Sequence, residues 1–228
     1  MATADEPLLI LIPGMGADER VFRAQQASFA NLQIPAWIKP QTAETLIGYA
    51  RRFAMAIDPG QACFIGGASF GGIVALEMAA RINARAVFLI GSIRSPGGMH
   101  WGLRAVRPLA RMTLALPFPI LGPLAELSLY SCGRYSNIST RSLLRQVSDA
   151  DASFLRWAVR AVLDWRPSTE VGRAPIYQIH GAKDRVFPAR LAAADMLVSG
   201  AGHLLSVTHG QAVNQFIAER MRKVSGEW

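Results

Sequence analysis

The sequence predicts an α/β protein built on a mostly parallel, doubly wound sheet. Short apolar segments alternate with segments of helical length. The expected strands are 7–13, 32–38, 62–66, 86–91, 175–179 and 196–199, and the expected helices are 17–29, 42–57, 69–81, 188–194 and 211–224. Continuous apolar runs of this length are typical of strands buried on both faces, and their alternation with helices calls for parallel strands joined by crossover helices.

The chain has 228 residues, of which 51% are hydrophobic and 18% charged, and this predicts a single domain with one excursion. The alternation stops after Gly91 and resumes at Pro175. We therefore interpret residues 95–173 as an insertion into a core formed by residues 1–94 and 174–228. Apolar residues recur at helical spacing near both ends of this insertion, and Pro108 is expected to break or kink the first helix.

The net charge of +8 is concentrated in the insertion, where the segment 94–173 holds 11 arginines against five acidic residues. Such a surface fits either simple solubility or an acidic partner or substrate. Nucleic-acid binding is not expected, because no recognition motif accompanies the charge.

The N-terminal residues indicate no membrane association. The apolar run 8–12 is too short for a signal sequence or a membrane span, so a cytoplasmic protein without integral membrane association is expected. With only two cysteines, Cys63 and Cys132, far apart in the sequence, two unpaired thiols are favoured over a disulfide.

A candidate nucleophile, Ser69, follows an apolar strand and opens a helix. It lies in the run Gly66-Gly67-Ala68-Ser69-Phe70-Gly71-Gly72. A G-x-S-x-G pattern at a strand-to-helix turn holds the serine in a strained conformation, and the flanking glycines let strand and helix approach closely. A glycine-rich helix start or a phosphate loop is the alternative, but a phosphate loop places a lysine before its serine and none is present here.

Serine needs a base to accept its proton, and His203 is the favoured histidine. It follows Gly200-Ala201-Gly202 directly after the last expected strand, whereas His209 lies at the start of the last helix and fits a helix cap. Asp184, on the loop after the preceding strand, is the candidate to orient the histidine, with an ordinary Asx turn as its alternative.

An oxyanion hole is expected from two backbone N–H groups. Phe70, the residue after the serine, supplies one, and Met15, in the turn Pro13-Gly14-Met15-Gly16, supplies the other. We also place Gly14, Met15, Phe70 and Val186 against the substrate, with a plain core role as the alternative for the methionine.

These motifs, in the order serine, aspartate, histidine, resemble those of the α/β-hydrolase superfamily over nearly the whole chain. The resemblance implies a sheet that lacks the first two family strands and a helical cap, residues 95–173, inserted after the sixth family strand. It also implies that the cap shapes the substrate pocket. One departure is Pro13, which replaces a common histidine and removes a hydrogen bond that braces the oxyanion loop.

The leading functional hypothesis is a carboxylic ester hydrolase that forms an acyl-enzyme on a small-molecule ester, without metal or cofactor. Thioesters, lactones and amides stay open, and dehalogenation is disfavoured because it uses an aspartate nucleophile. Three alternatives remain: an esterase for acyl groups on an acidic carrier protein, such as a pimeloyl methyl ester; a non-catalytic small-molecule binding protein; and an interfacial lipase. The carrier hypothesis depends on cap residues Arg104, Arg107 and Arg111.

Overall fold

The computed structural model describes residues 7–100, 102, 151–168 and 174–226. Within them the chain forms a parallel six-stranded sheet in the order β2-β1-β3-β4-β5-β6. The strands are β1 (Leu9–Ile12), β2 (Leu32–Gln33), β3 (Cys63–Ala68), β4 (Ala84–Ile90), β5 (Ile176–Gly181) and β6 (Met196–Val198). The predicted parallel sheet is confirmed.

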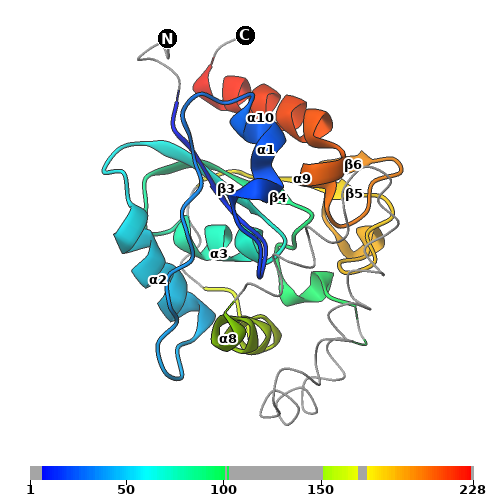
Figure 1. Ribbon diagram of the computed structural model, residues 1–228. Helices are drawn as coiled ribbons and strands as arrows, with labels where there is room; N and C mark the ends of the chain where they lie inside the picture. The colour runs from blue at the N-terminus through cyan, green and yellow to red at the C-terminus, as the bar shows by residue number, and fades with distance from the viewer. Residues whose placement is uncertain (1–6, 101, 103–150, 169–173, 227–228) are drawn as a thin grey trace.

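Helices cover both faces of the sheet (Figure 1). One face carries α2 (Leu46–Ile57), α3 (Phe70–Met78) and α8 (Ala152–Leu163), and the other carries α1 (Arg23–Gln26), α9 (Leu205–Thr208) and α10 (Gly210–Ser225). The short 3-10 turns are η1 (Glu19–Phe22), η2 (Pro96–Gly98) and η4 (Ala189–Leu191). The sheet is therefore doubly wound, as the sequence predicts.

Two apolar clusters fill the space between the sheet and its helices. Along β1, Ile10 and Ile12 point to the cluster under α2, α3 and α8, whereas Leu9 and Leu11 point to the cluster under α10. All four are at most 1% exposed. A strand buried on both faces in this way needs apolar residues at every position, which is why the pattern along β1 is continuous rather than alternating.

Three expected elements differ from the structure. The strand at 32–38 shortens to Leu32–Gln33, because Pro35 cannot donate a hydrogen bond to a sheet and β2 lies at its edge. The helix at 17–29 splits into η1 and α1, with the Asp18 side chain accepting a hydrogen bond from Arg20 N at the start. The helix at 188–194 is only the turn η4, because Ala192 is already extended toward β6.

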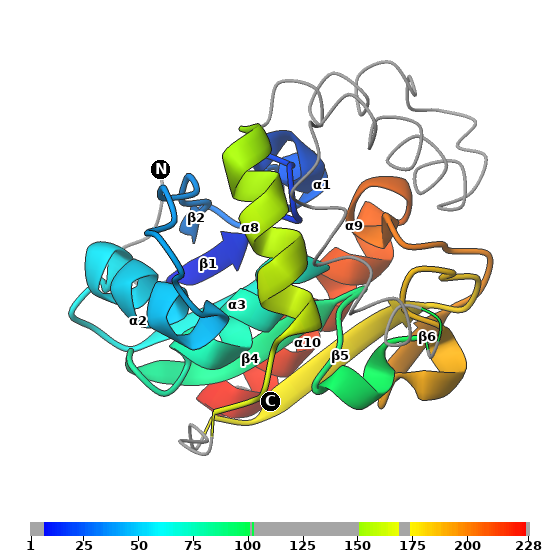
Figure 2. The ribbon, with the colours of Figure 1, turned by 90° about the horizontal axis from the view of Figure 1, so that it is seen from below.

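The described part of the proposed insertion includes α8, where the predicted helical spacing is confirmed and both Phe154 and Ala158 are buried. Figure 2 shows this helix crossing the face that α2 and α3 cover. The indole of Trp157 donates to the Glu44 carbonyl at 2.8 Å and that of Trp165 to the Glu77 carboxylate at 2.7 Å, so α8 is tied to the core.

Several predictions concern residues outside the described ranges. Arg104, Arg107, Arg111, Pro108 and Cys132 all lie there. Cys63 is a buried free thiol, and burial, together with the charge of Asp58, raises its pKa to about 11. Within the described residues, no helix is both long and apolar enough to cross a lipid bilayer.

Candidate active site

Ser69 lies at the turn between β3 and α3 with a backbone φ of 51° and ψ of −120°. Positive φ is uncommon for a residue other than glycine, so the surrounding chain must hold this conformation in place. Its N–H donates to the Ile90 carbonyl on β4 at 3.0 Å, and its carbonyl accepts from Gly72 N at 3.1 Å. A Cβ atom at Gly71 would overlap the Pro13 carbonyl oxygen. The tight approach expected of this motif is therefore present.

A buried polar pair behind the turn was not anticipated from the sequence. Ser92, just past β4, donates from its hydroxyl to the Ser69 carbonyl at 2.6 Å. The amide of Gln178 on β5 in turn donates to the Ser92 carbonyl at 2.9 Å. Both side chains are fully buried, and they brace the backbone of Ser69 from the side of β4 and β5.

The loop after β6 brings His203, and not His209, to the serine. His203 Nε2 lies 2.8 Å from Ser69 Oγ. The ring packs edge-to-face on Phe187, with centroids 5.5 Å apart. His209 instead stands at the N-cap position of α10, where its ring bonds to the neighbouring Thr208 hydroxyl and not to the helix backbone. Gly200, at φ 78°, supplies the left-handed turn that the loop requires.

Asp184 lies on the loop after β5 with both carboxylate oxygens engaged. Its Oδ2 is 2.8 Å from His203 Nδ1. Its Oδ1 accepts from the N–H groups of Val186 and Phe187, each at 2.9 Å. Asp184 therefore forms both of the expected interactions: Oδ1 closes the Asx turn, and Oδ2 contacts His203.

Asp184 is 5% exposed, and its buried carboxyl is held as an anion. Burial alone would raise its pKa, but hydrogen bonds from His180 and His203, the charge of His203 and the Phe187 N–H together hold the pKa well below its usual range. A buried carboxylate of this kind can fix the Nδ1–H tautomer of His203, which leaves Nε2 free to accept the Ser69 proton.

Of the residues expected around the oxyanion and substrate, Gly14 and Phe70 lie next to Ser69. A Cβ atom on Gly14 would lie 3.7 Å from that of Ser69, so the 14–15 turn runs alongside it. Phe70 begins α3, where the first N–H groups have no carbonyl partner within the helix. The side chains of Met15 and Val186 both pack on the apolar cluster that contains Phe70.

Aromatic side chains that were not predicted from the sequence pack around Phe70 in this apolar cluster. The ring of Trp37 contacts those of Phe70 and Phe154, at centroid distances of 5.6 and 5.1 Å. Trp157 on α8 closes the group, 6.0 Å from Phe70 and 4.3 Å from Tyr49. These aromatic residues are far apart in the sequence and share no local motif, because only tertiary packing brings them together.

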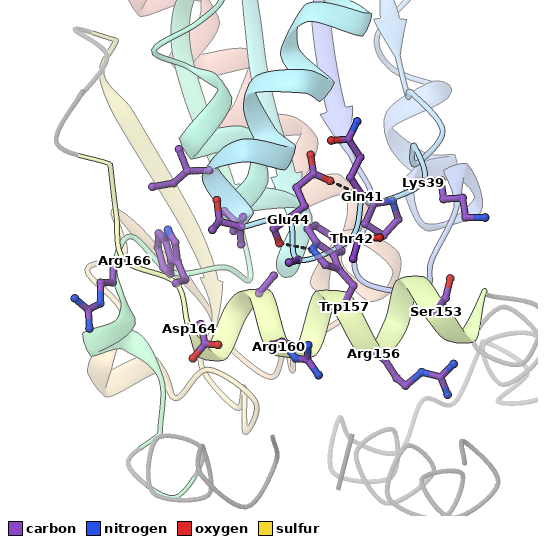
Figure 3. A pocket seen from close by; sticks show the side chains of 17 residues that line it. Lys39, Gln41, Thr42, Glu44, Ser153, Arg156, Trp157, Arg160, Asp164 and Arg166 are labelled. Atoms are coloured by element: carbon purple, nitrogen blue, oxygen red, sulfur yellow. Dashed lines mark hydrogen bonds between the residues drawn. The ribbon is translucent and has the colours of Figure 1, made fainter. Parts of the chain in front are cut away.

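A separate groove of about 730 Å³ runs between α8 and the segment before α2 (Figure 3). Lys39, Arg156, Arg160 and Arg166 line it, whereas the residues around Ser69 described above do not, apart from Trp157. The indole of Trp157 points toward Glu44 and away from the arginines of its own helix. The groove is therefore distinct from the serine site and shares one wall with the aromatic group beside it.

A model of the alpha/beta hydrolase family matches residues 8–216 of the sequence. The chain belongs to the alpha/beta hydrolase family. Membership of this family supports a hydrolase activity, and Ser69, Asp184 and His203 follow the carboxyl ends of β3, β5 and β6. No curated protein matches the sequence.

Solved structures share the fold of this alpha/beta hydrolase at low identity. MenH from S. aureus is 14% identical with a TM-score of 0.73, over 98% of this chain and 96% of that one. A thermophilic esterase from Thermogutta terrifontis is 17% identical with a TM-score of 0.71, over 96% and 90% of the two chains. A hydrolase from Pseudomonas aeruginosa is 18% identical with a TM-score of 0.71, over 96% and 91%.

Proposed function

We propose that the chain is a serine hydrolase that cleaves carboxylic esters through an acyl-enzyme, with Ser69 as nucleophile, His203 as general base and Asp184 as its orienting acid. One observation carries the proposal: an unbroken hydrogen-bonded series runs from Ser69 Oγ through His203 to Asp184, at 2.8 Å in both steps. A hydroxyl, an imidazole and a buried carboxylate in this arrangement are what nucleophilic catalysis by serine requires.

In the first half-reaction, Ser69 Oγ attacks the carbonyl carbon of the ester while His203 Nε2 takes the hydroxyl proton. The oxyanion of the tetrahedral intermediate is placed toward the N–H groups of Phe70 and Met15. Collapse of the intermediate expels the alcohol, which leaves with the proton from His203. In the second, His203 deprotonates a water that attacks the acyl-enzyme, and Ser69 recovers its proton as the acid departs.

The apolar cluster that contains Phe70, the residue after Ser69, favours a substrate with an apolar acyl group. Phe154 belongs to this cluster, and Met15, Val186 and Trp37 pack against it. Burial of hydrocarbon against apolar side chains contributes about 25 cal/mol to the free energy of binding for each Å² of apolar surface. Several structural neighbours are described as esterases and one as an N-acyl homoserine lactonase, a lactone being an internal ester. These descriptions agree with an ester bond as the target.

The test is release of p-nitrophenol from acyl esters of graded chain length by the wild type and by Ser69→Ala. We expect turnover with a chain-length optimum in the wild type and loss of about 10³-fold or more in the variant, because the nucleophile is removed. Labelling of Ser69 by a fluorophosphonate, located by mass spectrometry, provides a readout that does not depend on choosing the right ester. Equal turnover by both proteins, or labelling elsewhere, contradicts the proposal.

A further inference from the structure

A second imidazole reaches Asp184 from the strand below it. His180, the next-to-last residue of β5, has no exposed surface. Its Nε2 lies 2.7 Å from the Phe187 carbonyl oxygen and 3.2 Å from Asp184 Oδ2. A carbonyl oxygen can only accept a hydrogen bond, so Nε2 carries the proton and shares it between the two oxygens.

We propose that His180 is a positioning residue of the hydrolytic site, which anchors the Asp184 carboxylate and shares its negative charge with His203. The inference rests on the proposed function. With His180 included, the carboxylate is held by four N–H donors, two backbone groups on Oδ1 and two imidazoles on Oδ2. A carboxylate held on both oxygens cannot rotate away from His203 without breaking at least one buried hydrogen bond.

The remaining contacts of the imidazole indicate why a histidine stands at this position. Nδ1 of His180 is buried and has no hydrogen-bond partner among the described residues, so the polar contacts of the ring are those of Nε2–H. A purely apolar side chain would fill the same space without leaving a buried nitrogen unpaired. The one feature that an apolar residue lacks is the donor toward Phe187 and Asp184.

The charged groups that face the carboxylate are few. His180 faces it from β5 and His203 from the loop after β6, while Gly91 borders Oδ2 from the end of β4. The flanking Lys183 and Arg185 are exposed, and neither forms a hydrogen bond or ion pair with Asp184 within the described residues. The two imidazoles are therefore the principal donors between which Oδ2 divides its charge.

This division predicts the effect of removing His180. Once one donor is lost, Oδ2 offers more of its charge to His203 Nδ1–H and stabilises the protonated imidazole more strongly. The carboxylate is also less firmly oriented, which lowers the maximal rate.

The experiment compares His180→Leu with His180→Gln, whose amide nitrogen can replace Nε2–H as a donor. The pH dependence of kcat/KM is measured for each on the best p-nitrophenyl ester, with thermal unfolding as a check on folding. For His180→Leu we expect the acidic limb to move about 0.5 to 1 unit toward higher pH and kcat to fall about tenfold. His180→Gln should keep the wild-type limb. A folded His180→Leu protein whose limb does not move overturns the inference.

Nitrogen-15 NMR of the wild-type histidines supplies evidence that does not depend on the variants folding. The inference expects the His180 proton on Nε2 and a change in that signal in Asp184→Asn; a proton on Nδ1 would overturn it. Failure of the proposed function can be told apart from failure of this inference. If the proposed function is wrong, the wild type neither hydrolyses esters nor reacts with the fluorophosphonate, while the NMR signals of His180 still report on its hydrogen bonds.

Discussion

Asp184 is the residue on which the most polar contacts of the site converge, and the partners of its carboxylate are N–H donors. Two backbone N–H groups meet Oδ1 and two imidazole N–H groups meet Oδ2. An asparagine has one oxygen and one NH₂ group, so in either orientation its NH₂ must face donors. The side chain at this position must therefore offer a hydrogen-bond acceptor to the donors at Oδ1 and to those at Oδ2.

Asp184→Asn is accordingly expected to lose both activity and stability. We expect kcat to fall about 10⁴-fold, because the amide no longer fixes the correct tautomer of His203. The free energy of unfolding should fall by about 1–3 kcal/mol, because at least one buried donor is left unpaired. Ester hydrolysis and urea unfolding measure the two effects. Ser69→Ala is the matched control, since it should abolish activity while unfolding at a urea concentration close to that of the wild type.

The depressed pKa of Asp184 also gives its stabilising effect a direction with pH. Because the folded protein holds the carboxyl as an anion below the usual titration range, this contribution is present above the pKa of the unfolded chain and is lost as pH falls through the folded value. The contribution of Asp184 to the free energy of unfolding is therefore present only at pH values that keep its carboxyl ionised.

At the scale of elements, the site depends on how the end of β5 meets the loop that carries His203. A Cβ atom on Gly181 would overlap the Gly202 carbonyl oxygen and lie 2.7 Å from that of Ala201. Both obstacles are backbone atoms, which cannot rotate out of the way as a side chain can. At Gly181 the strand and the loop therefore contact each other directly through their backbones.

Gly181→Ala should push this loop outward and move His203 away from Ser69. We expect kcat/KM to drop about 100-fold, because a displacement of about 1 Å is enough to disrupt a hydrogen-bonded catalytic group. Gly97→Ala is the control: a Cβ there has its nearest neighbour at 3.4 Å, the Ser95 hydroxyl, and should leave activity unchanged. A Gly181→Ala protein with wild-type kinetics would show that the contact does not set the loop position.

The elements also show which parts of the molecule the sequence can predict. The meeting of Ser69, Asp184 and His203 could be predicted because each follows a buried strand in a short local motif, and parallel strands bring their carboxyl ends to one edge. The role of His180 could not be predicted, since nothing local reveals that its ring turns toward Asp184. Trp37 and Ser92 were missed for the same reason, because their partners lie on other strands and helices.

On the scale of the whole molecule, the segment after α8 is fastened to the core through a buried carboxylate on α3. Glu77 is 6% exposed and accepts from the Trp165 indole at 2.7 Å and from the Ser168 N–H at 3.3 Å. Burial raises the pKa of Glu77 more than these two hydrogen bonds lower it. The folded protein therefore binds this proton more tightly than the unfolded chain does.

This shift predicts a pH-dependent stability. Between the usual pKa of a glutamate and the raised value, the free energy of unfolding should decline as pH rises, because the folded state alone keeps the proton. Glu77→Gln should remove that decline while it still accepts from Trp165. Glu77→Leu should lose about 1–3 kcal/mol at all pH values, because the buried indole N–H loses its acceptor. Urea unfolding at several pH values tests both variants, and an unchanged slope in Glu77→Gln would contradict the expectation.

The neighbouring strands β4 and β5 lie on opposite sides of residues 95–173 in the chain. The turn that strains Ser69 is packed against β1, β3 and β4, all of which leave the ribosome before that segment. Asp184 and His203 follow β5 and β6, which are translated last. Since domains begin to fold from their N-terminal side during synthesis, the nascent chain can form the turn at Ser69 early, and Ser69, His203 and Asp184 come together only when the final strands dock.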